Sequence, residues 1–395
     1  MTTVESQGRV VRIGVLGCGN VGAAFVRLVE QQSSVIEQRT GVRLEIVSVA
    51  VRNMSRDRDV QLSEGLLTRD AHSVVADPNV DLVVEMIGGI EPARELISSA
   101  LAAGKPVVTA NKELLANVGT ELYAAADAAG VDLLFEAAVA GGVPVIRALR
   151  ESLRGEPVSR VMGIINGTTN FILSEMRDKG LDFEVVLKEA QRLGYAESDP
   201  TFDIEGVDAA HKVTLMSAIA FGIPVQFDKA YVEGITKLGA ADIKYAEQLG
   251  YRIKLLGITK RTNAGIELRV HPSLVPTQRL IANVEGAMNA VMVQGDAVGT
   301  TLYYGKGAGS EPTASAVIAD LVDITRLHTA DPLNRVPHLA FQPDAMSSLK
   351  ILPISEVVTS YYLRLRVADE AGVLAKLTGL LAQANISIDA VLQRE

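Results

Sequence analysis

A strand, a glycine-rich turn and a helix open the chain, and this arrangement restricts the fold more than any other feature. Residues 9–16 form an apolar run rich in β-branched residues, and Gly17-Cys-Gly-Asn-Val-Gly22 follows it. In this context Gly17 permits the tight turn, Gly19 lets a pyrophosphate approach the backbone, and Gly22 allows close helix packing. The helix N-terminus offers free N–H groups to an anion. The segment predicts a Rossmann-type unit that binds a dinucleotide.

Strand and helix patterns alternate after this unit, as expected for a parallel sheet wrapped by helices. Strands are predicted at 44–51, 81–87, 106–109 and 132–135, with helices from the turn to about Gln32, at 92–103 and at 111–129. A looser pattern follows, with strands predicted at 158–165, 251–260, 265–271 and 289–294 and helices at 169–179, 183–193, 206–222, 240–250 and 312–327. The fold class is therefore α/β, with a doubly wound parallel sheet followed by an α+β domain.

The C-terminal part is predicted to be separate from these two domains. A polar, proline-containing tract at 328–356 has the composition of a linker. A strand at 361–367, a turn at 369–372, a helix to Ala384 and a second strand are expected after it. We predict domains at 1–140 for cofactor binding and 141–350 for catalysis, with about 305–330 returning to the cofactor domain, and a C-terminal segment at 357–395.

Composition narrows the possible partners. The 395 residues carry a net charge of −9, contain no Trp and show no Lys/Arg-rich run, which argues against a nucleic acid or an anionic membrane as partner. The stretch 213–227 is too short and too polar for a membrane span. Cys18 is the single cysteine, which excludes an intramolecular disulfide and fits a reducing compartment. We therefore expect a cytoplasmic protein that acts on a small molecule.

Charge is concentrated where a loop passes into an apolar helix. The ionisable residues of this segment include Glu197, Asp199, Asp203, Asp208 and Lys212. Asp208 and Lys212 are one helical turn apart, so the carboxylate can orient the ammonium. Burial would then allow the amine to transfer a proton near neutral pH. The alternative is an exposed helix salt bridge, which contributes only about 0.3–0.5 kcal/mol.

The residues after the second strand indicate the cofactor type. An acidic residue there would bind the ribose 2′-hydroxyl of NAD, whereas the sequence has Arg52, Asn53, Arg56 and Arg58. An arginine suits a 2′-phosphate, so NADP is favoured and NAD remains possible. The alternative is that Arg52 is only a solvated loop charge.

Further motifs carry a resemblance to a known enzyme family. They are the ordered set Ala190, Gly194, Glu197, Asp199-Pro200, Asp203, Gly206, Asp208 and Lys212, with Ala110-Asn-Lys112, Phe135–Pro144, Ile165–Asn170 and Tyr304–Gly309. Over about residues 10–350 the chain resembles homoserine dehydrogenase. That enzyme interconverts L-homoserine and L-aspartate 4-semialdehyde with NAD(P), on the route to threonine, isoleucine and methionine. The resemblance implies that the α+β domain serves catalysis and dimerisation, in a homodimer or homotetramer.

The resemblance also implies roles for individual residues. Lys212 is the expected acid/base residue, Asp208 accompanies it, and Lys112 lies beside nicotinamide and substrate. The residues expected to bind the substrate are Glu197, Asp203, Asp208, Gly167 and Thr168. Those expected to bind the cofactor are Gly17, Gly19, Asn20, Val21, Gly22, Arg52, Lys112 and Gly307. A monovalent cation, typically sodium, is expected to bind at Glu136, Val139, Gly141 and Val143, largely through backbone oxygens. Alternatively, Asp203 caps the following helix and Lys112 caps a loop.

The C-terminal segment resembles the opening βαβ part of an ACT domain. Its Asp369-Glu-Ala-Gly-Val-Leu374 matches the turn at which such domains bind amino acids. The second half of an ACT domain does not follow in this sequence. We therefore expect a partial ACT-like regulatory segment with weak feedback control by threonine.

Two other functions compete with this interpretation. An aldehyde dehydrogenase that forms a thioester needs a catalytic cysteine far from the glycine-rich turn, and Cys18 lies inside the turn. A non-catalytic dinucleotide sensor would not need the acidic residues and lysines described above. Both alternatives are disfavoured by these residues.

Overall fold

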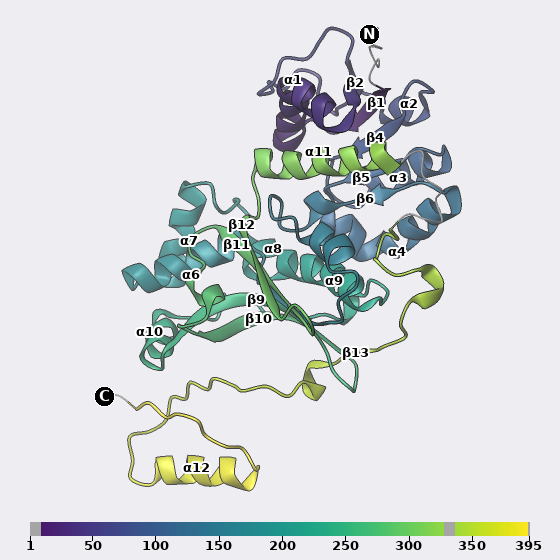
Figure 1. Ribbon diagram of the computed structural model, residues 1–395. Coiled ribbons are helices and arrows are strands. Elements are labelled where there is room, and N and C mark those ends of the chain that lie inside the picture. Colours follow the sequence, from purple (N-terminus) through teal and green to yellow (C-terminus); the bar gives the residue numbers. More distant parts are fainter. Residues whose placement is uncertain (1–8, 328–335, 394–395) are drawn as a thin grey trace.

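The computed structural model describes residues 9–327 and 336–393. Figure 1 shows the first sheet and its helices at one end, the second sheet in the middle, and the C-terminal helix α12 at the other end.

The first sheet is parallel, with strand order β3-β2-β1-β4-β5-β6. Its strands are β1 (Arg9–Leu16), β2 (Val42–Ala50), β3 (Leu67–Thr68), β4 (Leu82–Glu85), β5 (Val107–Thr109) and β6 (Leu133–Leu134). Its helices are α1 (Asn20–Thr40), α2 (Ala71–Ala76), α3 (Ala93–Ala102) and α4 (Lys112–Ala129). The strand order reverses between β1 and β4, where open α/β sheets bind their ligands. The predicted Rossmann-type sheet is confirmed.

Helix α1 is longer than the sequence predicts. It continues past Gln32 to Thr40 and ends at Gly41, whose φ of 70° is left-handed. The Gly41 N–H donates to Glu37 O at 2.7 Å. Several side chains of these added turns are exposed, so the apolar periodicity that marked the first turns fades.

The second sheet is mostly antiparallel, with order β12-β11-β7-β9-β10-β13 and β8 beside β10. Its strands are β7 (Val158–Ile164), β8 (Tyr231–Val232), β9 (Tyr251–Arg261), β10 (Ile266–Pro276), β11 (Met288–Gly295), β12 (Thr300–Lys306) and β13 (Ile351–Leu352). The accompanying helices are α5 (Val145–Arg147), α6 (Gly167–Lys179), α7 (Phe183–Arg192), α8 (Thr201–Ile204), α9 (Val207–Phe221) and α10 (Ala240–Gln248). Strand β12 was not expected, because its side chains are half-buried or exposed and give no apolar pattern.

Helix α9 forms the centre of the second domain. Residues 208–221 are all buried, between strands β9 and β10 on one side and helix α4 on the other. Gly257 of β9 allows this approach, because a Cβ there would lie 3.1 Å from the Val213 Cβ. The predicted buried helix over 206–222 is thus confirmed, within one residue at each end.

Helix α11 (Ser310–Leu327) returns to the first sheet after the chain has built every strand of the second one except β13. It packs against α1, and Ala314, Val317 and Leu321 share an apolar core with Phe25. Arg27 of α1 also pairs with Glu311 at 2.5 Å. The layer around the first sheet is therefore covered by a segment from much later in the chain (Figure 1).

The linker expected at 328–356 is wrong for the part that the structure describes, and 328–335 lie outside the described residues. His338 stacks on Tyr123 of α4, with ring centroids 5.8 Å apart, and its Nε2 lies 3.2 Å from Asp127 Oδ1. Further on, β13 pairs with β10. Apolar side chains at 339, 351, 352 and 357 are buried, which the polar composition of the tract concealed.

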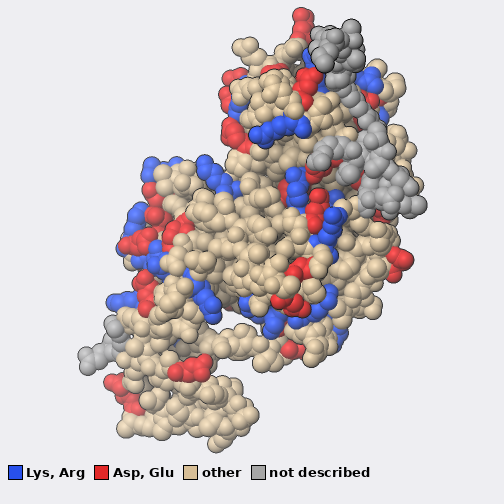
Figure 2. All heavy atoms as spheres, viewed as in Figure 1, with Lys and Arg blue, Asp and Glu red and all other residues tan. Residues whose placement is uncertain are grey.

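The C-terminal segment holds helix α12 (Val373–Gln383) but not the strands predicted on either side of it. Residues 361–367 have no strand partner within the described ranges, so their alternating apolar side chains are exposed, with Tyr361 at 72% and Leu363 at 60%. Tyr362 and Arg364 contact Asp242 of α10 at 3.1 and 3.2 Å. Figure 2 shows that the end of the molecule formed by this segment carries few charged side chains on the visible face.

The packing of residues 336–357 can be tested at Gly222, the residue that ends α9. Its φ is 60°, and a Cβ would lie 2.7 Å from the Phe341 ring. Gly250, with φ 84° and nothing within 4 Å of such a Cβ, is the matched control. Gly250→Ala should lose about 1–2 kcal/mol of unfolding free energy from the left-handed backbone alone, and Gly222→Ala about 1–3 kcal/mol more from overpacking. If denaturant unfolding showed equal losses of unfolding free energy in Gly222→Ala and Gly250→Ala, the contact of Gly222 with Phe341 would be contradicted.

Candidate functional site

The charged residues predicted in α9 meet a lysine from the first domain. Lys212 Nζ lies 2.7 Å from Asp208 Oδ2 and donates to Ile165 O at 2.8 Å. Lys112 Nζ lies 3.1 Å from the other carboxylate oxygen, Asp208 Oδ1. Asp208 and Lys212 are 4% and 8% exposed, so the exposed salt bridge considered from the sequence is wrong. The structure brings Lys212, Asp208 and Lys112 together.

Local sequence explains how each of these side chains is positioned. Helix α4 begins at Lys112 because the Asn111 side chain accepts the Leu114 N–H at 3.1 Å. Helix α9 follows Gly206, which has a φ of 83° and provides no side-chain cap. The two helix N-termini pack against each other, and one turn of α9 separates the carboxylate from the amine.

Burial and pairing act in opposite directions on these groups. Burial disfavours the charged form of Lys212, and together with the nearby Lys112 charge it lowers the pKa of Lys212. Burial also works against the Asp208 carboxylate, but the two lysines outweigh it and hold its pKa well below the ordinary value. For Lys112 the Asp208 charge outweighs burial and raises the pKa. The site therefore keeps Asp208 ionised and makes Lys212 the more easily deprotonated of the two lysines.

Asn166 joins a second carboxylate to this group. Its amide nitrogen donates to Asp203 Oδ1 at 2.6 Å and to Asp208 Oδ2 at 2.8 Å. Burial and the Asp208 charge raise the pKa of Asp203, and the amide opposes this rise. Asp203 lies within α8 and does not cap α9, so the cap considered from the sequence is wrong. Sequence reasoning missed Asn166, although an Asn before a helix is a recognisable N-cap signal.

The remaining predicted substrate residues are placed differently from one another. Gly167 starts α6 and lies so close to β11 that a Cβ would be 2.8 Å from Ala287 O. The Thr168 hydroxyl donates to Tyr195 O at 2.7 Å and also lies near Asp203. Glu197 is exposed, and within the described ranges its carboxylate makes no ion pair. The structure thus groups Gly167 and Thr168 with the acidic residues but leaves Glu197 apart.

The glycine-rich turn fits a dinucleotide. Gly17 has a φ of 98°, and a Cβ there would lie 2.7 Å from Met86 O, whereas a Cβ on Gly22 would lie 2.4 Å from Gly17 O. Nothing lies within 4 Å of a Cβ on Gly19. No side chain caps α1, so the N–H groups of Asn20 and Val21 begin the helix with no side-chain acceptor. These N–H groups and the space above Gly19 could hold a pyrophosphate.

The arginines of the loop after β2 differ in their contacts. Within the described residues, no hydrogen bond or ion pair involves the guanidinium groups of Arg52 and Arg56, both of which are exposed. Arg58 donates to Asn53 O, Met54 O and Arg56 O, so its guanidinium holds the loop together. Arg52 is exposed beside the end of β2. A basic group that is already committed to the loop is a poorer phosphate ligand than one that is not.

The loop predicted to bind a cation follows β6. The Glu136 carboxylate accepts the N–H groups of Ile146 and Arg147 at 3.1 and 2.7 Å, and burial raises its pKa to about 7. Ala140 and Gly141 have positive φ values of 56° and 44°. Within the described part of the chain, no hydrogen bond reaches the carbonyl oxygens of Val139 or Gly141. Backbone oxygens are therefore available here, and the Glu136 side chain is not.

Gly307 lies against this same loop. A Cβ on Gly141 would lie 2.8 Å from Gly307 O, and one on Gly307 would overlap the Asn289 side chain. Gly142 N–H donates to Lys306 O at 3.0 Å. The predicted cation loop and the second glycine-rich stretch therefore form one packed unit, which leads into α11.

Cys18 does not resemble a catalytic thiol. It is 5% exposed within the core around α1, and burial raises its pKa. A nucleophilic cysteine needs an exposed, electropositive setting that lowers the pKa. This placement agrees with the exclusion of a thioester mechanism.

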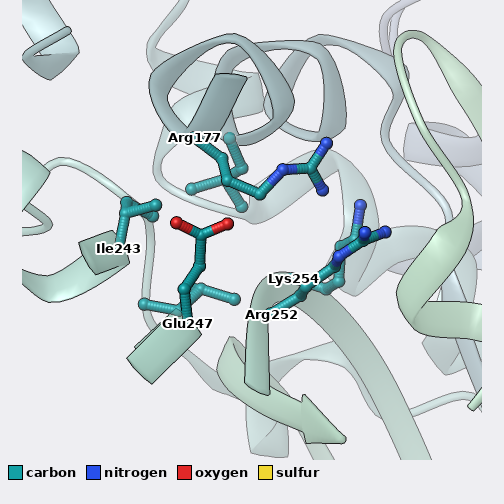
Figure 3. A pocket seen from close by; sticks show the side chains of 7 residues that line it. Arg177, Ile243, Glu247, Arg252 and Lys254 are labelled. Atoms are coloured by element: carbon teal, nitrogen blue, oxygen red, sulfur yellow. The ribbon is translucent and has the colours of Figure 1, made fainter. Parts of the chain in front are cut away.

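A separate pocket lies between α6, α10 and β9 (Figure 3). Its basic side chains already have partners: Arg177 and Arg252 both bind Glu285, at 2.8 and 2.7 Å. Lys254 donates to Asn170 Oδ1 at 3.1 Å and to Val284 O at 2.6 Å. Figure 3 shows the Glu247 carboxylate directed toward Arg177. We interpret this pocket as a structural ion cluster that supports α6.

No helix among the described residues has the length and apolar character needed to cross a membrane. No cluster of three His, Cys, Asp or Glu side chains that could hold a metal ion occurs within 9–327 and 336–393.

Comparison with known proteins gives consistent matches. Residues 144–322 match the family described as homoserine dehydrogenase, 17–136 match its NAD-binding domain, and 361–395 match the ACT domain. The homoserine dehydrogenase of Pseudomonas aeruginosa is 55% identical over 98% of this chain and 88% of that protein. The crystal structure of a homoserine dehydrogenase from Thiobacillus denitrificans has 61% identity and a TM-score of 0.94, over 98% of this chain and 89% of that one. A hyperthermophilic archaeal homoserine dehydrogenase in complex with NADPH has 26% identity and a TM-score of 0.68, over 80% and 98% of the two chains.

The glycine-rich turn predicts different effects of two glycine substitutions. Gly17→Ala should lower both the melting temperature and cofactor affinity, because a Cβ clashes with Met86 O in a left-handed backbone. Gly19→Ala should keep the melting temperature and weaken cofactor binding, because its Cβ fills only the space above the turn. Thermal unfolding and fluorescence titration with NADPH measure the two effects. Unchanged NADPH affinity in Gly19→Ala would place the pyrophosphate elsewhere.

Proposed function

The chain belongs to the homoserine dehydrogenase family, and we propose that Lys212, Asp208 and Lys112 form its reaction centre. It is an NAD(P)-dependent oxidoreductase that interconverts L-homoserine and L-aspartate 4-semialdehyde. The observation that carries the assignment of roles is the buried contact of Lys212 with Asp208 and Ile165 O.

Lys212 is proposed to transfer the proton of the substrate hydroxyl. Its two hydrogen bonds, to Asp208 and to Ile165 O, match the two N–H groups of a neutral amine. The amine lone pair is then left to accept the hydroxyl proton of homoserine during oxidation, and the resulting ammonium returns it during reduction. The bound nicotinamide supplies or accepts the hydride. Burial, which lowers the pKa of Lys212, favours the neutral form that oxidation requires.

The acidic residues are proposed to hold the α-ammonium group of the substrate. Asp203 is half-buried beside Asp208, and its carboxylate faces the same site as Lys212. Gly167 and Thr168 line this place from the start of α6. Glu197 is proposed to join them through the loop before α8. Lys112 is proposed to stabilise the negative charge that develops on the substrate oxygen.

The cofactor is proposed to be NADP, with NAD as a weaker alternative. The glycine-rich turn from Gly17 to Gly22 would hold the pyrophosphate, and Gly307 would contact the nicotinamide end from the loop before α11. The exposed Arg52 is the proposed ligand of the 2′-phosphate, since no acidic residue takes its place after β2.

A sodium ion is proposed at the loop after β6, bound by the backbone oxygens of Glu136, Val139, Gly141 and Val143. The available carbonyl oxygens of Val139 and Gly141 support this proposal. Hard oxygen ligands suit such a cation. When bound, it would add positive charge close to the glycine-rich stretch at 305–309.

The biological setting is also proposed. We place the protein in the cytoplasm, on the route to threonine, methionine and isoleucine. We assign residues 1–140 to cofactor binding, 141–350 to catalysis and dimerisation, and 357–395 to regulation. A homodimer or homotetramer is supported by the exposed apolar side chains of the C-terminal segment, including Val358 at 91% and Leu380 at 56%.

Lys212→Ala tests the proposed acid/base role. The change should lower kcat for homoserine oxidation by ~10²-fold or more while cofactor affinity stays intact. In the parent chain kcat/KM should rise with pH through the lowered pKa of Lys212, and this rise should disappear in the variant. Lys244→Ala, an exposed lysine on α10, is the control. If Lys212→Ala kept its kcat within tenfold of the parent, the proposed acid/base role of Lys212 would be contradicted.

Arg52→Ala tests cofactor selection. Loss of a charged phosphate contact should weaken NADP binding by roughly 10-fold or more and change NAD binding little. Arg39→Ala, near the far end of α1, is the matched control because that end lies away from the glycine-rich turn. Titration of each purified variant with both cofactors measures the effect. Equal losses for NADP and NAD would show that Arg52 does not bind the 2′-phosphate.

A further inference from the structure

The amide of Asn166 lies between two carboxylates that would otherwise repel each other. Each oxygen it meets belongs to a different residue, Asp203 Oδ1 at 2.6 Å and Asp208 Oδ2 at 2.8 Å. Asn166 is 5% exposed, and Asp208 is 4% exposed. Like charges close together in a buried site disfavour the ionised form of one of them.

A primary amide suits this position better than a charged group. Its two N–H donors lie in one plane at a fixed separation, so one nitrogen can satisfy two acceptors at once. It is neutral and leaves the charge balance among Asp203, Asp208 and the two lysines unchanged. Lys212 shares the Asp208 Oδ2 atom with Asn166, while Lys112 uses Asp208 Oδ1. The amide therefore fixes how the Asp208 carboxylate is turned toward both lysines.

We propose that Asn166 is a positioning residue for the reaction, whose amide bridges Asp203 and Asp208 and sets their separation for the α-ammonium group of the substrate. The inference rests on the proposed function, since it takes Asp203 as a substrate ligand and Lys212 as the proton-transfer residue. A carboxylate has room for about four donors. Asn166 uses only part of that capacity on Asp203, and the Thr168 hydroxyl donates to Tyr195 O instead, which leaves acceptor positions for an ammonium.

A purely structural role for Asn166 can be separated from this one. Its side-chain oxygen accepts the Thr169 N–H and hydroxyl, both at 2.9 Å, and so caps α6. The cap uses the oxygen, whereas the bridge uses the nitrogen. Asn166→Ser keeps a good N-cap residue but cannot reach both carboxylates. Asn166→Asp also keeps an acceptor for the cap, and it replaces the donors with a third negative charge.

The bridge predicts how the acid limb of the pH profile responds. Asp203 faces Asp208 and Lys212 from α9, Lys112 from α4 and Thr168 from α6. Removing the amide donors leaves the Asp208 charge less compensated, so Asp203 should hold its proton to a higher pH. The acid limb of kcat/KM for homoserine, meaning here the step that belongs to Asp203 and not the rise through the pKa of Lys212, should move upward in Asn166→Ser and further in Asn166→Asp. The value of kcat/KM on the plateau should fall about 10- to 100-fold, the range spanned by hydrogen bonds to charged groups.

Asn170→Ser in the same helix is the matched control. The Asn170 amide donates to Val284 O, Gly286 O and Met288 O, all backbone groups away from the carboxylates. This variant should lower the melting temperature without moving the acid limb. Asn166→Ser should move the acid limb and raise KM for homoserine, with NADPH affinity and melting temperature close to those of the parent.

Two measurements on the full chain decide the proposal. The first is steady-state oxidation of homoserine across pH by parent, Asn166→Ser, Asn166→Asp and Asn170→Ser. The second is a carbon-13 NMR titration of aspartate carboxyl groups, with the Asp203 signal identified by its loss in Asp203→Asn. If Asn166→Ser had the same acid limb and the same Asp203 titration as the parent chain, the proposal that Asn166 bridges the two carboxylates would be overturned. A parent chain that does not oxidise homoserine would contradict the proposed function instead, and the carboxyl titration, which needs no turnover, would still decide the bridge.

Discussion

The pairing of Asp208 with two lysines is the interaction on which the rest of the site depends. An unpaired carboxylate at this depth would cost several kcal/mol, so α9 can be buried on all sides only if cations reach both oxygens. Lys212 comes from the same helix, but Lys112 comes from α4 beneath the first sheet. The Asp208 carboxylate is therefore paired with both lysines only when the two domains are correctly packed against each other.

Much of this site follows from local sequence, and the rest depends on contacts between distant segments. The turn at 17–22 and the spacing of Asp208 and Lys212 are fixed by neighbours within one helical turn, and such patterns are visible in a sequence. The contact of Lys112 with Asp208 joins residues far apart in the chain. The resemblance to a family indicated a shared site for them, but composition and periodicity did not.

The two incorrect predictions of secondary structure and the missed role of Asn166 have a common physical origin. Polar composition at 328–356 predicted a linker, yet a few buried side chains and a pairing with β10 hold its described part, 336–356, on the second sheet. Alternating apolar residues at 361–367 predicted a strand, yet a strand needs a partner for its backbone groups. The dual use of Asn166 was also hidden, because an N-cap explains its oxygen and gives no hint of what its nitrogen binds. In each case the deciding partner is supplied by tertiary structure.

The return of α11 to the first sheet has a consequence for synthesis on the ribosome. The six strands of the Rossmann-type sheet are complete once Leu134 has been made, but the face of α1 that Val317 and Leu321 cover remains open until much later. A nascent chain therefore carries an uncovered apolar helix while every strand of the second sheet except β13 emerges. Domains generally fold as units during synthesis, and here the first unit to be translated stays open until most of the second has been made. Early nascent chains should be good substrates for chaperones that bind exposed apolar helices.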